Sequence, residues 1–293
     1  MGVGRTAAAL LWAGVSLFAS QPAALVVYDS GVEAFGEALD GLKAELSPAG
    51  IEALDLRAAG AQIELARLLG RHEVRLAIAI GSESLAAVRA ANAGVPVIAT
   101  MVLRPPNPDS LRGQVDLELP VATWLAQMKL LLPKHRRVGI IRSRAHASQT
   151  TAAVETAARQ QGYTAVVIDC DGPADLLQAL AALKGRVDLV LCPPDADLYN
   201  SVTIKPLILA SLEHRLPIIG FSSAFVRAGA VAGIYPDYRE IGRQTGELAW
   251  RILRGEDGSH AEGPRKVHAA INQRVAHLLG VDFQASPAVE VLR

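Results

Sequence analysis

The sequence has 293 residues, of which 51% are hydrophobic and 20% are charged, so the chain can bury the cores of two ordinary domains. The 29 basic residues balance the 29 acidic ones, and only 4% of the residues are aromatic. Proteins that grip nucleic acid carry a basic surface and rings for base stacking. This composition therefore excludes nucleic acid as the expected partner.

The N-terminus has the pattern of an export signal. Arg5 precedes an apolar run over residues 6 to 19, and small residues follow it. The run is too short to cross a bilayer of roughly 30 Å as a helix. We expect a signal peptide at residues 1–23 that is removed on export to the periplasm and leaves a soluble protein. The alternative is a buried first helix.

Short apolar runs typical of buried strands then alternate with segments of helical periodicity. In the first half we expect strands at 24–28, 51–56, 75–80 and 96–100, and helices at 32–46, 62–70 and 83–91. The second half has expected strands at 137–141, 164–169, 187–192 and 216–220, and helices at 119–132, 147–161, 173–183 and 204–214. Such βαβ repeats predict parallel sheets with right-handed crossovers.

The pattern is interrupted at residues 104–118, where three prolines and a glycine are typical of a hinge-like linker. The last part of the chain shows strands at 228–234 and 267–271, helices at 238–253 and 273–279, and a polar loop at 255–263. We therefore expect an α/β protein with two doubly wound parallel-sheet lobes joined by a multi-strand hinge. Lobe one is expected at 24–117 plus about 229–266, and lobe two at 118–228 plus about 267–293.

The two cysteines, Cys170 and Cys192, lie at the ends of two expected strands of the second lobe that are consecutive in the sequence. In the strand order 2-1-3 these strands lie on either side of the strand at 137–141, about 9 to 10 Å apart. A disulfide needs Cα atoms within about 7 Å. We expect both cysteines to be free and mostly buried.

Sequence motifs of catalysis are missing. The chain has no Gly-rich dinucleotide or phosphate loop, no G-x-S-x-G elbow, and no His pair at zinc-ligand spacing. Catalytic groups can still meet in space, so an enzyme stays open as an alternative. We expect no enzymatic activity, no catalytic or metal-binding residues and no cofactor.

The strand ends carry the candidate ligand-binding residues, because ligands of open α/β sheets bind beyond the carboxyl ends of the strands. These ends are rich in small, hydroxylated and charged residues. The candidates are Ser30, Gly81, Ser82, Glu83 and Met101 in lobe one, and Arg142, Arg144, Asp195, Phe221, Ser222 and Ser223 in lobe two.

Several of these candidates have a specific expected role. The Gly81-Ser82 turn opens a helix whose free N–H groups favour an anion, or else Ser82 only caps that helix. Arg142 or Arg144 could bind a carboxylate with its fork of donors, or be a surface charge. Asp195 could hold a ligand amine, or simply be a turn residue. Aromatic side chains expected near the cleft permit stacking on a ring: Tyr28, Phe221, Phe225, Tyr235 and Tyr238.

A family resemblance lies in residues 216–280. An apolar strand leads to small polar residues, then to V-x-A-G-A at Val226–Ala230 and to G-R-Q-x-x-E-x-A-x-x-I-L-x-G at Gly242–Gly255. A later A-x-x-L-G covers Ala276 to Gly280. This series resembles ABC-transporter solute-binding proteins of the tryptophan/sugar type.

The resemblance implies a type I periplasmic binding fold of the Venus-flytrap kind. It implies that a small molecule, an amino acid, sugar or similar, is held between the lobes by hinge closure, and that an ABC permease in the membrane recognises the closed form. It also places Asp237 at the cleft. We expect a monomer. The alternatives are a ligand-sensing or accessory extracellular module no longer tied to transport, or a two-lobed α/β enzyme.

The chain departs from the family pattern at three expected ligand contacts, one of them at Leu111–Val115, where the family usually has Thr-Gly-Val/Ile. It has Ser82-Glu83-Ser84 where the family often has Thr-Pro, and Arg142-Ser143-Arg144 where the family often has Asn-Pro. These differences leave the class of ligand open.

Overall fold

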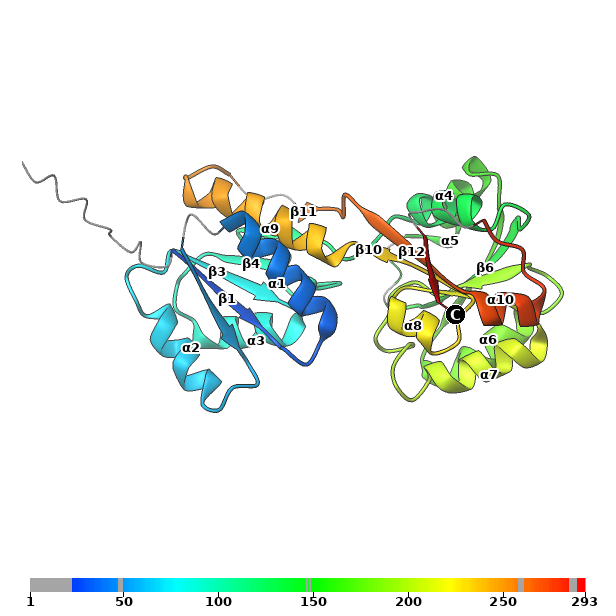
Figure 1. Cartoon of the computed structure of the whole chain (residues 1–293), viewed down its shortest axis with the longest axis horizontal. Coiled ribbons are helices and arrows are strands. Elements are labelled where there is room, and N and C mark those ends of the chain that lie inside the picture. The colour runs from blue at the N-terminus through cyan, green and yellow to red at the C-terminus, as the bar shows by residue number, and fades with distance from the viewer. Residues whose placement is uncertain are drawn as a thin grey trace, which may run out of the picture.

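Two α/β lobes lie side by side along the long axis of the molecule and are joined by a narrow set of crossing segments (Figure 1). The computed structural model describes residues 23–46, 50–145, 147, 149–257, 261–284 and 289–292. Apart from Ala23, the expected signal peptide lies outside these residues and stays a prediction. Among the described residues, none of the helices has both the length and the apolar character that a membrane crossing needs.

Lobe one is built on a six-stranded sheet in the order β11-β5-β4-β3-β1-β2. Its strands are β1 (Ala24–Tyr28), β2 (Ile51–Asp55), β3 (Leu76–Ile80), β4 (Val97–Thr100), β5 (Gly113–Val115) and β11 (Ala261–Glu262). All of the pairings between these strands are parallel. The central strands, such as β3, are buried along their whole length, as expected for strands covered on both faces.

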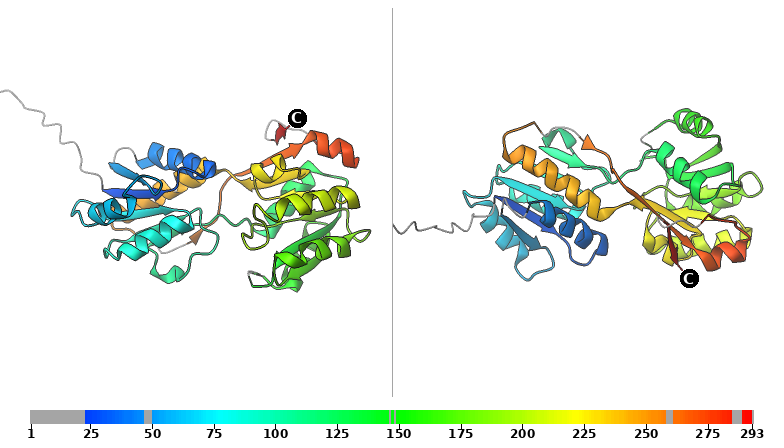
Figure 2. Two further views of the ribbon diagram at one scale, coloured as in Figure 1. Left: turned by 90° about the horizontal axis from the view of Figure 1, so that it is seen from below. Right: turned by 45° about the horizontal axis from the view of Figure 1, so that its top comes forward.

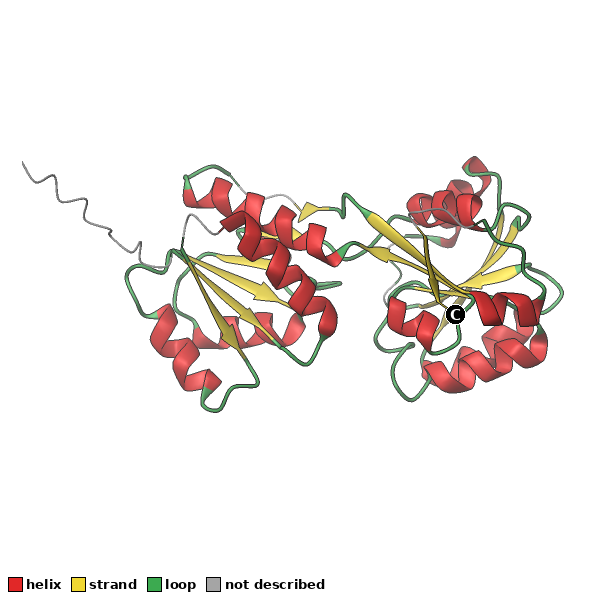
Figure 3. Cartoon of the chain, in the orientation of Figure 1, coloured by secondary structure: helices red, strands yellow, loops and turns green. Residues whose placement is uncertain are grey.

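Helices cover both faces of this sheet (Figure 3). One face is packed by α1 (Glu33–Leu46) and α9 (Tyr238–Leu253), and the other by α2 (Ala61–Leu69) and α3 (Ser82–Ala91). A short 3-10 turn at Pro108–Ser110 lies in the connection from β4 to β5. Lobe one therefore depends on a helix, α9, that the chain makes only after most of lobe two.

Lobe two has a seven-stranded sheet in the order β13-β12-β10-β9-β8-β6-β7. Its strands are β6 (Arg137–Ser143), β7 (Thr164–Cys170), β8 (Leu189–Leu191), β9 (Ile218–Gly220), β10 (Ala232–Pro236), β12 (Val267–Asn272) and β13 (Val289–Leu292). Of the pairings in the described part of this sheet, only β10 with β12 is antiparallel.

The helices of lobe two also form two layers. One face of the sheet carries α4 (Val121–Leu131), α5 (Thr151–Gln160) and α10 (Gln273–Leu279). The other carries α6 (Leu176–Leu183), which follows a 3-10 turn at Pro173–Asp175, with α7 (Ile204–His214) and α8 (Ser223–Arg227). Figure 2 shows the two lobes from two further directions, with the crossing segments between them. The predicted fold class, two doubly wound parallel-sheet lobes, is confirmed.

The structure corrects two details of the predicted organisation. Residues 104–118 were expected to form a hinge-like connector without a strand, but they contain β5, which extends the sheet of lobe one. The return to lobe one was expected near residue 229, but β10 pairs with β9 and β12 and so belongs to lobe two. The chain crosses back at Asp237, because the apolar residues of β10 find partners on both sides within the second sheet.

Helices α1 and α9 pack with their backbones in close approach. A Cβ atom on Gly41 would collide with the carbonyl oxygen of Arg239, and one on Gly242 would collide with that of Ala38. The close approach buries Ile241 completely in the core that both helices share with the sheet. Glycine is therefore required at this contact for steric reasons.

We expect Gly242→Ala to lower the free energy of unfolding by about 1–3 kcal/mol, because the added methyl group must push two helix backbones apart. Urea denaturation followed by circular dichroism measures this. Gly36→Ala in α1 is the matched control, since its Cβ would meet nothing within 4 Å. The control should stabilise the helix by roughly 0.5–1 kcal/mol. Equal effects of the two substitutions would contradict the steric account.

Both cysteines are free and buried, as predicted. They lie on opposite sides of β6, because the strand order is β8-β6-β7. Burial raises the pKa of the Cys170 thiol to about 11 and that of the Cys192 thiol to about 12.

We expect neither thiol to react with iodoacetamide at about pH 8 in the folded protein, because a raised pKa leaves almost no thiolate, the reactive form, at that pH. Intact-mass measurement checks this. The same protein unfolded in guanidinium chloride should take up two labels. Rapid labelling of the native protein, or an intact disulfide, would contradict the prediction.

Candidate functional site

The carboxyl ends of the strands in the two lobes meet at three neighbouring cavities. The largest, which we call the cleft cavity, has a volume of about 530 Å³ and is lined mainly by lobe one. Its lining includes Phe35, Ser82, Glu83, Ser84, Met101 and Leu103. Ala196 adds the contribution of lobe two.

Two smaller cavities extend this space towards lobe two. The apolar cavity, of about 190 Å³, lies between the lobes and is lined by Phe35, Met101, Trp124, Phe221 and Tyr238 among others. The lobe-two cavity, of about 50 Å³, is lined by Arg104, Trp124, Arg142 and Asp195 among others. Phe35 and Met101 line the cleft cavity and the apolar cavity, and Trp124 lines both smaller ones, so the three cavities adjoin one another.

The polar end of the site is the N-terminus of α3. Gly81 is the residue before this helix, with φ of +89° and no side chain to cap the helix. A Cβ atom there would collide with the ring of Phe35. The N–H groups of the first turn, Ser82 to Ser84, have no acceptor within the described part of the chain. Free N–H groups and the helix dipole make this end of the cavity favourable for an anion.

Ser84 adds a side chain to these backbone donors. It is only 1% exposed, lines the cleft cavity, and its hydroxyl has no hydrogen-bond partner among the described residues. A buried hydroxyl without a partner costs about 1–3 kcal/mol. A ligand carboxylate bound at this end would accept a hydrogen bond from Ser84 and remove that cost.

The other end of the site is apolar and aromatic. Phe35 and Tyr238 come from lobe one, and Trp124 and Phe221 from lobe two. The ring of Phe221 is held by Tyr199 and Phe225, at centroid distances of 6.0 and 5.4 Å. These rings can enclose a flat apolar group from both sides.

Met101 joins the two ends at the strand end of β4. Its side chain is buried and lines both the cleft cavity and the apolar cavity. Its backbone has φ of +57°, a left-handed conformation that a residue with a side chain rarely adopts. Such strain is typical of binding sites, where the surrounding structure holds a side chain in place.

The structure brings together many of the candidate residues from the sequence. Those that line one of the three cavities are Ser82, Glu83, Met101, Arg142, Asp195, Phe221 and Ser222. Ser222 also caps α8, because its hydroxyl accepts a hydrogen bond from the N–H of Phe225 at 3.1 Å.

Arg142 is occupied by partners within the protein. Its Nε donates to Asp169 at 2.7 Å, its Nη1 to the carbonyl of Gln149 at 2.7 Å and its Nη2 to Thr151 at 3.3 Å. Each guanidinium nitrogen therefore already has an acceptor, and the side chain holds neighbouring segments of lobe two together at the wall of the cavity.

Asp195 is also engaged, although it lines the lobe-two cavity. Its carboxylate accepts hydrogen bonds from the N–H groups of Ser143, Asp197 and Leu198 at 3.2–3.3 Å, and it is 2% exposed. These bonds order the turn after β8 and attach it to β6. Of the two roles considered from the sequence, these contacts fit that of a turn residue.

The remaining candidates do not line the three cavities: Ser30, Gly81, Arg144, Ser223 and Asp237. Arg144 is exposed and donates to Asp171 at 2.7 Å. Asp237 caps α9, because its Oδ1 accepts a hydrogen bond from the N–H of Glu240 at 2.9 Å. Its Oδ2 lies 3.1 Å from Nε2 of His268. Gly81 contributes to the site through its backbone only.

Sequence reasoning missed Phe35, Trp124, Leu103 and Arg104, and it placed Ser84 at an expected ligand contact without including it among the candidate ligand-binding residues. Phe35 and Trp124 fall on the apolar face of helices, so their periodicity is that of core residues. Leu103 and Arg104 belong to the connection that was interpreted as a linker. Ser84 had one local signal, since it follows the Gly81-Ser82 turn within the first turn of a helix.

The described residues contain no group of three or more His, Cys, Asp or Glu side chains arranged to hold a metal ion.

Comparison with known proteins gives a consistent result. The family model of ABC transporter substrate binding proteins matches residues 26–290. A tyrosine-binding protein of Clostridioides difficile (strain R20291) is 26% identical over 193 residues, which is 62% of this chain and 55% of that protein. The match thus spans little more than half of that relative's length.

Two solved structures share the fold. An ABC domain from Streptococcus pneumonia in complex with L-Trp has a TM-score of 0.63 and 16% identity, covering 93% of this chain and 100% of that one. The ligand-free, open structure of a Clostridium difficile substrate binding protein with adhesive properties has a TM-score of 0.64 and 18% identity, covering 92% of this chain and 98% of that one. These likenesses confirm the type I periplasmic binding fold.

Proposed function

This chain belongs to the family of ABC transporter substrate binding proteins, and from that premise we propose that it captures an amino acid with an aromatic side chain in the cleft between its lobes. L-Tyrosine and L-tryptophan are the first candidates. In this proposal the closed protein hands its ligand to an ABC permease. The family consists of binding proteins, in agreement with the expectation that the chain is not an enzyme.

The observation that carries the proposal is that the Ser84 hydroxyl, which has no partner among the described residues, lies beside an aromatic cavity. Ser84 and the free N–H groups of α3 suit a carboxylate, and the rings of Phe35, Trp124 and Phe221 suit an apolar ring. A volume of about 530 Å³ for the cleft cavity is in the usual range for small-molecule sites. A sugar needs polar partners around its whole body, and the apolar cavity offers few.

Acidic side chains beside this site suit the ligand's ammonium group. Glu83 and Asp29 both line the cleft cavity. A hydrogen bond from the N–H of Gly31, and then one from Arg57, lower the pKa of Asp29 and keep it ionised. Because Arg57 Nε lies 2.5 Å from Asp29 Oδ1 and offsets that charge, Glu83 is the acidic side chain that would attract an ammonium group and favour a zwitterion over a simple acid.

Relatives also support the choice of ligand. A tyrosine-binding protein is similar in sequence, and a protein of the same fold was solved with L-Trp.

Delivery to a permease from outside the membrane requires export, which is the role we assign to residues 1–23. An uptake assay in cells lacking this chain separates delivery from sensing, since unchanged uptake would leave only the sensing role.

Isothermal titration of the protein with L-tyrosine and L-tryptophan tests the proposal, with tyramine and tryptamine as controls that lack the carboxylate. We expect the titration to show binding of the amino acids and much weaker binding of the amines. In a separate thermal-unfolding measurement, the amino acids should raise the melting temperature of the protein by mass action. Equal affinity for the amines would refute the carboxylate site. Chemical conversion of a bound amino acid would show an enzyme instead.

Ser84→Ala should weaken binding of the preferred amino acid roughly tenfold to a hundredfold, because a hydrogen bond to a charged group is lost. The melting temperature of the ligand-free protein should stay the same or rise, since the substitution removes an unpaired buried hydroxyl. Ser211→Ala is the matched control, because Ser211 is equally buried in α7 but donates to the carbonyl of Ile208 at 2.8 Å. It should lower stability and leave affinity unchanged; the opposite pattern would exclude Ser84 as a ligand contact.

A further inference from the structure

Three short segments connect the lobes. The first leaves lobe one after Asp116, whose N–H donates to the carbonyl of Glu262 at 2.8 Å, and leads into α4. The second runs from β10 into α9 at Asp237, and the third runs from β11 through residues 263–266 into β12.

The second and third crossings leave lobe two as one paired ribbon. The pairing of β10 with β12 continues to Pro236 opposite Val267, and the N–H of Asp237 donates to the carbonyl of Lys266 at 3.0 Å. The ribbon therefore moves with lobe two up to Asp237 and Lys266.

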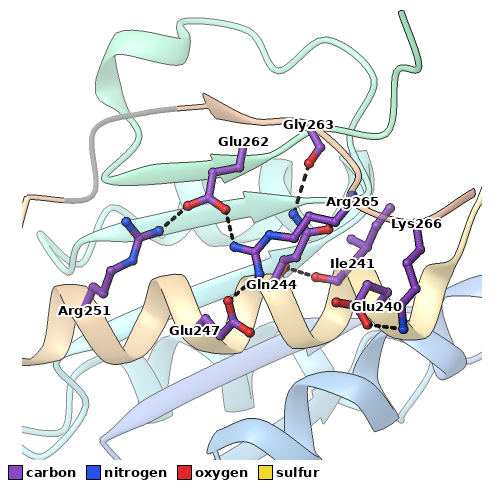
Figure 4. Close-up of polar contacts among 10 residues, drawn as sticks. Glu240, Ile241, Gln244, Glu247, Arg251, Glu262, Gly263, Arg265 and Lys266 are labelled. Carbon is purple, nitrogen blue, oxygen red and sulfur yellow. Dashed lines mark hydrogen bonds and ion pairs between the residues drawn. The ribbon is translucent and has the colours of Figure 1, made fainter. Parts of the chain in front are cut away.

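A single buried side chain attaches the third crossing to lobe one. Gln244 lies in the middle of α9 and is fully buried. Its Nε2 donates to the carbonyl of Gly263, and its Oε1 accepts the N–H of Arg265, both at 3.0 Å (Figure 4). One side-chain amide thus pairs with the backbone C=O of Gly263 and the backbone N–H of Arg265, as the backbone of a neighbouring strand would.

Charged pairs flank this amide along α9 (Figure 4). The Nζ of Lys266 lies 3.1 Å from Oε2 of Glu240. The guanidinium of Arg265 lies 2.5 Å from Oε2 of Glu247 through Nη1 and 3.0 Å from Oε2 of Glu262 through Nη2. Partly exposed ion pairs contribute little individually, because water and salt screen them. The buried amide is therefore the specific anchor, and the charges guide the crossing onto the helix.

We propose that Gln244 is a positioning residue for ligand capture. It fastens the third crossing to lobe one and so confines rotation between the lobes to residues 117–119, Asp237 and Lys266. This inference rests on the proposed function, in which the lobes close on a ligand. Residues at the bending points also line the site: Leu117, Leu119, Pro236 and Tyr238. A short, defined hinge returns these side chains to the same place at each closure.

Loss of the amide should release the crossing without unfolding the lobe. Gly263, Arg265 and Lys266 are exposed, so water can replace the lost hydrogen bonds to their backbone. The released segment would lengthen the hinge and let the lobes sample a wider range of orientations.

The test is the distribution of distances between the lobes in the ligand-free protein, measured by electron–electron resonance between two spin labels. Ile63→Cys in lobe one and Val202→Cys in lobe two provide exposed labelling sites, at 80% and 78% exposure, whereas the native cysteines are buried. Gln244→Met has a side chain of similar length without hydrogen-bonding groups. We expect it to broaden the distribution, and to weaken binding of L-tyrosine or L-tryptophan about tenfold.

Arg243→Met is the matched control, since Arg243 is the exposed neighbour on the same helix, and it should leave the distribution unchanged. Gln244→Glu keeps the acceptor for Arg265 but turns the donor to Gly263 into an oxygen that repels that carbonyl, so it should also broaden the distribution, and it serves if Gln244→Met does not fold. An unchanged width in both Gln244 variants, or equal broadening by Arg243→Met, would overturn the inference. If neither amino acid binds the parent protein, the proposed function fails, while the widths still decide the role of Gln244.

Discussion

The close packing of α9 against α1 is the contact on which the two-lobed arrangement depends. Lobe one lacks part of its core until the chain returns from lobe two, and glycines at positions 41 and 242 let the two backbones approach closely enough to complete it. A chain that must return to finish its first lobe, and then add β12 and β13 to its second, crosses between the lobes three times. The hinge is thus a consequence of how lobe one buries its hydrophobic face.

The binding site shares residues with that hinge. Leu117 and Leu119 belong to the first crossing, and Pro236 and Tyr238 to the second, and all four line the cavities. The polar donors at the start of α3 lie instead on a rigid element of lobe one. In the proposed function, recognition of the carboxylate is therefore preformed on lobe one, and rotation of the lobes would bring the apolar walls together. Such a division lets the ligand bind first to one lobe and then stabilise the closed form.

The regular elements were largely predictable from local patterns. The helices at 204–214, 238–253 and 273–279 begin and end in the structure at the predicted residues, and two of them start at a capping side chain, Asp237 and Asn272. The short strands β5, β11 and β13 were missed, of which β11 and β13 lie at sheet edges. Strands as short as Gly113–Val115 or Ala261–Glu262 carry no periodicity, and only their pairing with a distant segment makes them strands.

The sequence by itself determined the alternation of strands and helices, the doubling into two lobes, the separation of the cysteines and the set of strand ends at the cleft. Each follows from hydrophobic periodicity or from the handedness of βαβ units, which act over neighbouring residues. Only the tertiary structure decided that Arg142 is bound by Asp169, that Asp195 accepts the N–H of the distant Ser143, and that the Ser84 hydroxyl has no partner among the described residues. Hydrogen-bond partners depend on which distant segments meet, and no local pattern records that meeting.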